Sequence, residues 1–171
     1  MARAVAAQRL KPDKLDLGWE RLEFLLKEPG IRDLITDYWL ELSPLRLPLD
    51  IDWTRLLRHE AEGIYRIWTA RVNGTLAGFA AFYVQPHMYH RSVLAGIDAG
   101  HYLSPVFRDK GMVGWRMWRS ALKALKEEGV SFVMTHDNSR RPLMPFFLAL
   151  GLEPLSTIWI GVLNGSSESG D

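Results

Sequence analysis

The sequence predicts an α/β (α+β) domain in which helices pack on a mixed, mostly antiparallel central sheet, and two stretches of the chain carry this prediction. Residues 64–84 form two β-rich runs joined by Asn73-Gly74, a dipeptide that favours a tight hairpin because both of its residues tolerate positive φ. Residues 93–136 have the pattern strand, amphipathic helix, strand, which places two strands in parallel through a right-handed crossover. The hairpin therefore supplies antiparallel pairs and the crossover a parallel one.

The chain before the hairpin is predicted to be helical. One helix is expected over residues 13–30, where leucines recur at helical spacing until a Pro-Gly pair ends the pattern. A second helix is expected over residues 31–44, whose apolar side chains share one broad face. A third should begin after Asp50 or Asp52 as the N-cap and end at Gly63.

After the hairpin the pattern alternates between strands and helices. The long amphipathic helix carries Trp115 and Trp118 on one apolar stripe, which assigns both side chains to the core. The remaining elements are expected as a loop over 85–91, a strand over 93–104, the long helix ending at Gly129, a strand over 130–136, a helix over 141–151 and a strand over 153–163.

Length and composition indicate one ordinary globular domain. A chain of 171 residues, with 47% hydrophobic and 24% charged residues, suits a single core. We expect this domain over residues 17–163, with a helical part over 17–63 and the hairpin and core over 64–163. Residues 1–16 are expected to form an N-terminal tail and the polar residues 164–171 a disordered one.

Charge and cysteine content exclude several classes of function. The formal net charge of +1 and the lack of a base-stacking motif disfavour a nucleic-acid partner. No apolar run approaches the ~20 residues that span a membrane. The chain has no cysteine, which excludes disulfides and thiolate metal sites and fits a reducing cytoplasm. Its five histidines include no HExxH spacing, so no metal is expected.

The stretch "SPVFRDKGMVGW", residues 104–115, joins a strand to the long helix and could bind an anion. The first turn of a helix has unpaired N–H groups and a dipole that favours negative charge. A glycine such as Gly111 lets a ligand approach the backbone closely. On these residues alone, the stretch is either a phosphate cradle or an ordinary helix start.

Two motifs and the order of elements resemble the GNAT acetyltransferase superfamily. Its signature Arg/Gln-x-x-Gly-x-Gly/Ala is matched by Arg108 and Gly111, with Val113 at the last position, and its aromatic-x-x-x-Gly-Phe segment falls on residues 147–152. The resemblance in element order covers residues 64–163. The segments "YWLEL", "LDIDWTRL", "PHMYHRS" and "HYLSPVFRDKG" are similar to GNAT-type proteins encoded in bacteriophage and prophage genomes.

The resemblance implies that the chain binds an acyl-CoA, acetyl-CoA first of all, and transfers the acyl group to an amine by direct attack on the thioester. The acceptor could be a small molecule, a peptide or a protein. A backbone N–H near His101 or Leu103 would polarise the thioester carbonyl. The residues implied to hold the cofactor are Leu103, Arg108, Asp109, Lys110, Gly111, Met112, Val113, Gly114, Asn138 and Ser139.

Two residues of the strand before this turn are candidates for the catalytic base. Asp98 interrupts an apolar strand, where a carboxylate is costly to bury unless it is paired. It is therefore either a base with a shifted pKa or a structural carboxylate that pairs with an arginine or caps a strand bulge. His101 is either a base, for which the intrinsic pKa of histidine is suitable, or a half-exposed structural histidine. Tyr102 could serve as an alternative acid or belong to the core.

Two departures from the family pattern favour a second hypothesis. Phe147 stands where many relatives have a tyrosine that protonates the leaving thiolate. Val113 adds bulk where a small residue is usual, although the neighbouring Gly114 could shift the turn by one residue. The alternative is a catalytically weak or inactive GNAT-fold protein with a structural or interaction role, for instance in a phage particle. We expect a cytoplasmic enzyme, in the host cytoplasm if phage-encoded, with a virion component as the alternative, and we leave open a homo-oligomer or virion assembly.

Overall fold

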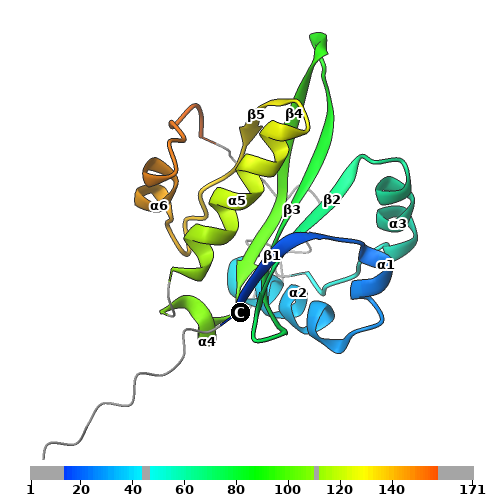
Figure 1. Cartoon of the computed structure of the whole chain (residues 1–171), viewed down its shortest axis with the longest axis vertical. Coiled ribbons are helices and arrows are strands. Elements are labelled where there is room, and N and C mark those ends of the chain that lie inside the picture. Colours follow the sequence, from blue (N-terminus) through cyan, green and yellow to red (C-terminus); the bar gives the residue numbers. More distant parts are fainter. Residues whose placement is uncertain (1–13, 44–46, 110–111, 158–171) are drawn as a thin grey trace, which may run out of the picture.

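The computed structural model describes residues 14–43, 47–109 and 112–157. Within these residues one five-stranded sheet has the order β1-β2-β3-β4-β5. Neighbouring strands are antiparallel except β4 and β5, which are parallel, so the predicted mixed, mostly antiparallel sheet is confirmed (Figure 1). The strands are β1 (Leu15–Glu20), β2 (Tyr65–Val72), β3 (Thr75–His87), β4 (His90–Leu103) and β5 (Val130–Met134).

Helices connect the strands and pack on the sheet. The cap expected for α3 is formed by Asp52, whose Oδ1 accepts a hydrogen bond from the Arg55 backbone N–H at 2.9 Å, and the helix is followed by Gly63 at φ 73°. In the described part of the chain the helices are α1 (Leu22–Leu25), α2 (Pro29–Leu42), α3 (Trp53–Ala61), α4 (Pro105–Arg108), α5 (Val113–Glu127) and α6 (Met144–Ala149). None of these described helices is both long and apolar enough to cross a membrane.

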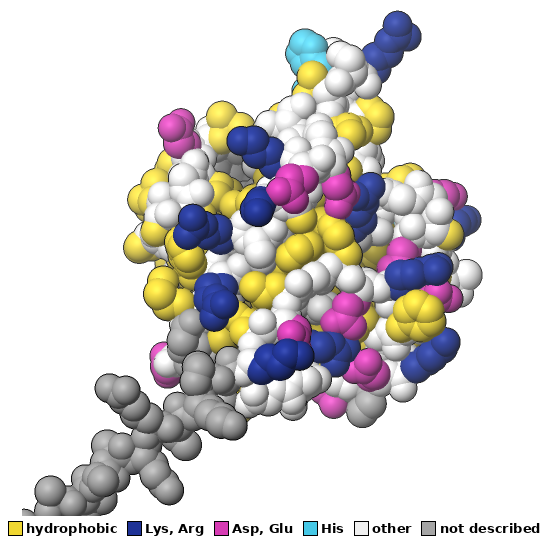
Figure 2. All heavy atoms as spheres, viewed as in Figure 1, with side chains coloured by type: hydrophobic (Ala, Val, Ile, Leu, Met, Phe, Trp, Pro, Cys, Tyr) yellow, Lys and Arg dark blue, Asp and Glu magenta, His cyan; other side chains and the backbone are white. Residues whose placement is uncertain are grey.

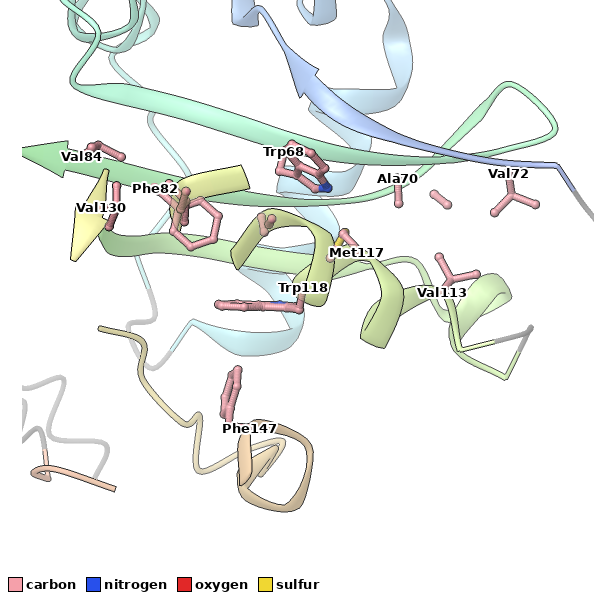
Figure 3. Packing of buried hydrophobic residues seen from close by; sticks show 14 residues of the cluster. Trp68, Ala70, Val72, Phe82, Val84, Val113, Met117, Trp118, Val130 and Phe147 are labelled. Atoms are coloured by element: carbon pink, nitrogen blue, oxygen red, sulfur yellow. The ribbon is translucent and has the colours of Figure 1, made fainter. Parts of the chain in front are cut away.

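The two faces of the sheet bury two separate apolar clusters. Strand residues of one parity, such as Trp68 and Phe82, pack with α5, and Figure 3 shows Trp118 of α5 between the sheet and Phe147 of α6. Strand residues of the other parity, such as Phe79, pack with α1 and α2. Because side chains alternate between the faces of a strand, α2 and α5 lie on opposite sides of the sheet.

The prediction of a helix over residues 13–30 is wrong for the first half of this range. Leu15–Glu20 is strand β1, which pairs antiparallel with β2 from Leu15↔Val72 to Glu20↔Ile67. Its Leu15, Leu17 and Trp19 alternate with polar or small residues and pack against the α5-side cluster. Short apolar segments fit both a strand and a helix periodicity, and the unpaired edge of β2 decides in favour of the strand.

The loop expected over residues 85–91 is also wrong, because β3 and β4 continue into it. His87 pairs with His90 across a turn at Met88 and Tyr89, and the hairpin projects beyond the body of the molecule (Figure 1). On the face in Figure 2, acidic and basic side chains are interspersed, as the net charge of +1 suggests. Of the last strand expected over 153–163, residues 153–157 have no regular structure and the rest lie outside the described residues.

Candidate active site

A pocket of about 260 Å³ passes through the sheet beside β4. Tyr38 of α2 lines one part of it and Trp118 of α5 another, although these helices lie on opposite faces. The passage exists because β4 and β5 stop pairing at Ile97↔Met134, while β4 continues to Leu103. Two ligands could therefore reach each other from the two sides of the sheet.

A bulge in β4 places two predicted catalytic residues side by side. Phe82 pairs with Asp98 and Ala81 with Gly100, so one residue of β4 has no counterpart on β3, and Gly100 has a φ of 145°. Residues three positions apart in a regular strand face opposite ways. The bulge removes this alternation, and Asp98 and His101 both face α5.

Asp98 is the centre of a buried hydrogen-bond network. Its side chain is 0% exposed, and its Oδ2 lies 2.8 Å from His101 Nδ1 and 3.9 Å from His136 Nδ1. The Thr135 hydroxyl donates to the same oxygen at 2.6 Å, and the Gly100 backbone N–H donates to Oδ1 at 2.9 Å. Burial opposes ionisation, but the charge that His101 carries when protonated, together with its hydrogen bond, outweighs it and holds the pKa of Asp98 below its ordinary value.

This network fixes the tautomer of His101. An ionised carboxylate only accepts hydrogen bonds, so His101 Nδ1 carries the proton. In the neutral ring Nε2 is then the free acceptor, and His101 lines the pocket. Its ring is held by edge-on contacts with Trp118 at 5.0 Å and Phe147 at 5.8 Å between centroids. His101 can therefore act as a base towards a ligand, and Asp98, whose side chain has no exposed surface, can act through His101.

The backbone of β4 offers donors on the open side. The Ser104 N–H donates to Ala77 O of β3 at 2.9 Å. Because N–H directions alternate along an antiparallel strand, the N–H groups of His101 and Leu103 point away from β3. This is the side on which β5 has ended, so both groups face the gap between the strands.

The start of α5 differs from the expectation about Val113. Val113 is 5% exposed and packs in the α5-side cluster (Figure 3), so its bulk points away from any ligand. Gly114 lines the pocket instead, and a Cβ there would lie 3.3 Å from Leu103 Cδ2. A small residue at 114 therefore fits with little displacement of the Leu103 side chain. Met112 precedes the helix in the left-handed region at φ 59°, while the predicted Lys110 and Gly111 lie outside the described residues.

Arg108, predicted as a phosphate ligand, is held by protein groups. Its Nε donates to Leu103 O at 2.9 Å and its Nη2 to Glu41 Oε2 at 2.7 Å. Glu41 also accepts from the Tyr102 hydroxyl at 2.8 Å and from Arg141 Nη1 at 3.2 Å. Burial by itself raises the pKa of Glu41, but these partners outweigh it and lower that pKa. Glu41 therefore ties α2 to β4 and to the segment after β5.

The remaining predicted residues are divided between the pocket and the surface. Asn138 lines the pocket, and its Nδ2 donates to Leu42 O of α2 at 2.8 Å. Asp109 and Ser139 are exposed. Trp115 lines the pocket, and the Arg119 guanidinium lies 4.7 Å from the centroid of its ring, so the prediction that Trp115 belongs to the core is wrong. The same prediction for Trp118 is confirmed, because Trp118 is 1% exposed.

Sequence reasoning missed four residues that complete the site. Tyr38 and Glu41 belong to α2, and their approach to β4 depends on how α2 packs on the sheet. Thr135 and His136 directly follow β5, and a polar pair at the end of a strand that runs parallel to the Asp98 strand was a usable signal. The described residues contain no cluster of three or more acidic or histidine side chains suited to a metal ion.

Residues 29–152 match the acetyltransferase (GNAT) family. The chain belongs to this family. A comparison with curated protein sequences gives no match. Membership of the GNAT family places the chain among acyltransferases that act on amines, and the pocket at the end of β4 is the candidate site for that chemistry.

Solved structures share the fold at low sequence identity. An aminoglycoside acetyltransferase from an uncultured soil metagenomic sample, in complex with trehalose, has a TM-score of 0.68 and 14% identity over 88% of this chain and 97% of its own. The ribosomal-protein-alanine N-acetyltransferase from Brucella melitensis biovar Abortus 2308 has a TM-score of 0.66 and 18% identity over 89% of this chain and 98% of its own. A predicted acetyltransferase from Clostridium acetobutylicum, with acetyl-CoA, has a TM-score of 0.58 and 16% identity over 87% of this chain and 96% of its own.

Proposed function

We propose that this GNAT protein is an acetyl-CoA-dependent N-acetyltransferase that transfers the acetyl group directly to an amine. The observation that carries the proposal is the pocket that joins the two faces of the sheet at His101. A thioester entering from the α5 side and an amine entering from the α2 side would meet there without a covalent enzyme intermediate. Membership of the family supports the acyl-CoA donor.

The cofactor would lie along the end of β4 and the start of α5. The N–H groups of Val113, Gly114 and Trp115 in the first turn of α5 have no intrahelical partner and would bind the pyrophosphate. Gly114 leaves room for this approach because it lines the pocket without a side chain. The pantetheine arm would then pass between β4 and β5, with Asn138 on its other side.

The chemical roles follow from the network around Asp98. His101 Nε2 would take the proton from the amine, since only the neutral amine attacks a carbonyl. Asp98 is a positioning residue that holds the His101 tautomer. The N–H groups of His101 and Leu103 would stabilise the developing oxyanion in the gap. The bulge in β4, which brings Asp98 and His101 to the same face of the sheet, supports these roles.

The acceptor is assigned only as an amine. Structures named for an aminoglycoside and for a ribosomal-protein alanine share the fold to nearly the same extent, with TM-scores of 0.68 and 0.66. Fold similarity therefore does not choose between a small molecule, a peptide and a protein. A panel that contains all three classes of amine is the appropriate substrate set.

The test combines binding with turnover. Acetyl-CoA should raise the melting temperature, because a ligand that binds only the native state stabilises it. Gly114→Asp places a carboxylate against the pyrophosphate and should remove this shift, while the matched Gly114→Ala adds only a methyl group and should keep most of it. A wild-type protein with no thermal shift at saturating acetyl-CoA would contradict the proposal.

Phe147 favours one competing function, a GNAT-fold protein that has lost efficient catalysis and serves in assembly. Phe147 packs on His101 and has no proton to give to a thiolate. This hypothesis predicts acetyl-CoA binding without release of free CoA for any amine in the panel. Release of CoA that depends on an amine and on His101 excludes it.

A further inference from the structure

Tyr38 of α2 lines the pocket, and its hydroxyl lies beside Gly100 in the β4 bulge. A Cβ placed on Gly100 would lie 3.4 Å from both Cζ and Oη of Tyr38, so the phenol end rests against the backbone of the β4 bulge. Edge-on contacts hold the ring, at 6.2 Å from Phe79 and 6.3 Å from Tyr102 between centroids. Tyr38 thus reaches the gap from the face opposite His101.

Four other proton-bearing side chains of the pocket are already engaged. The Tyr102 hydroxyl donates to Glu41, and His101 Nδ1 donates to Asp98. Arg108 and Arg141 are held by Glu41 and do not lose their protons in proteins.

Tyr38 Oη, by contrast, has no hydrogen-bond partner among the described residues. Burial, with a smaller effect from the negative charge of Asp98, raises the pKa of Tyr38. Its hydroxyl therefore stays protonated at neutral pH and is available as a donor. The remaining candidate, His136, is 39% exposed and lies 3.9 Å from Asp98.

We propose that Tyr38 is a catalytic residue that protonates the leaving thiolate of CoA. The proposal rests on the acyl-transfer function proposed above. The amine nitrogen forms a bond to the thioester carbon, the C–S bond breaks, and the sulfur keeps the electron pair. Tyr38 gives its Oη proton to that sulfur and regains one from solvent, while His101 Nε2 receives the proton of the amine.

This assignment supplies the donor that Phe147 lacks. The donor and the base then reach the thioester from opposite faces of the sheet, Tyr38 from the α2 side and His101 from the α5 side. A hydroxyl on the α2 side is close to sulfur only if the sulfur lies in the gap beyond the last β4–β5 pair, Ile97↔Met134. The pocket beside this gap is lined by residues from both faces of the sheet.

The experiment measures the thiol pKa of bound CoA and needs no acceptor. Thiolate ultraviolet absorbance is titrated for CoA complexes, with the desulfo-CoA complex as the blank for protein tyrosines. The variants are Tyr38→Phe, His136→Gln and the control Tyr83→Phe, whose half-buried ring contacts His59 and Tyr65 away from the pocket. Calorimetry records CoA affinity for each protein.

A hydrogen bond to the thiolate lowers the thiol pKa, by roughly 1–2 units for a charge-assisted bond. We expect the bound thiol pKa to rise by this amount in Tyr38→Phe and to stay unchanged in the other two variants. If all proteins bind CoA and Tyr38→Phe leaves the thiol pKa unchanged, or if only His136→Gln raises it, the Tyr38 assignment is overturned alone. If the wild type does not bind CoA, the proposed function falls and this assignment with it.

Discussion

Replacing Asp98 by asparagine tests the central part of the site, because it changes the charge and one donor while keeping the shape. An asparagine can still accept the Gly100 N–H through Oδ1, but its amide NH₂ faces His101 Nδ1 where Oδ2 accepted before. His101 must then accept at Nδ1 and carry its proton on Nε2. The base is lost, so kcat should fall on the order of 10²–10⁴-fold, the usual contribution of general-base catalysis.

The same change has a defined cost in stability. Asp98 accepts from His101, Thr135 and Gly100 in a site with no exposed side-chain surface, and weakening such charge-assisted bonds costs about 1–3 kcal/mol. Because the pKa of Asp98 is depressed in the fold, its stabilisation is present at neutral pH and disappears as the pH falls below the ordinary carboxyl value of ~3.9. The difference in unfolding free energy between wild type and Asp98→Asn should therefore shrink in acid.

Two measurements check this prediction. Imidazole ¹⁵N NMR reports the tautomer directly and should show Nδ1 protonated in the wild type and Nε2 protonated in the variant. Steady-state kinetics with an amine from the panel gives kcat, and Asp33→Asn, at an exposed position on α2, is the control. Asp98→Asn with an unchanged tautomer and wild-type kcat would refute the positioning role.

Further predictions concern three other parts of the structure. Val113→Ala should lower the unfolding free energy by about 1–3 kcal/mol, because it removes more than one buried methylene but less than a Leu→Ala change does. It should leave acetyl-CoA affinity unchanged, because the Val113 side chain is in the core. Chemical denaturation and calorimetry measure the two effects, and a loss of affinity with no loss of stability would contradict the placement of Val113. Glu41→Gln removes a carboxylate whose side chain is 31% exposed. Because solvent screens its ion pairs, we expect the unfolding free energy to fall by only about 1 kcal/mol. Since the pKa of Glu41 is lowered, this difference should vanish as the pH drops below ~4.3, and denaturation at neutral and acid pH tests it. Gly100→Ala is strained at φ 145° and crowds Tyr38 at 3.4 Å; we expect reduced stability and a larger KM, measured against Gly18→Ala, where nothing lies within 4 Å.

Local sequence signals predicted most of the fold. Asn73 and Gly74 both have positive φ, at 51° and 83°, as the hairpin prediction required. The parallel pair β4–β5 followed from the strand, helix, strand pattern. β1 was missed because six residues give too short a pattern to separate periods of 2 and 3.6, and its state depends on an edge of β2 that is formed far away in the sequence.

The site was predicted less completely, because it depends on a break in regularity. A spacing of three between Asp98 and His101 suggests opposite faces in a regular strand, and only the bulge at Gly100 brings them together. Gly100 was visible in the sequence, but a glycine in a strand marks a bulge only in some cases. Tyr38 and Glu41 could not be found in this way, since their roles come from the packing of α2 against β4.

The two departures from the family pattern now have different meanings. Val113 is an effect of register: it occupies the core position of the first turn of α5, and Gly114 takes the pocket side. Phe147 is a real change of chemistry, because it has no proton to donate; its buried ring packs on Trp118 and on His101, the proposed base. A tyrosine there would put a proton donor beside His101, whereas the proposed donor Tyr38 lies on the other side of the sheet. The loss of a hydroxyl at position 147 is therefore compatible with catalysis if the acid and the base are separated by β4.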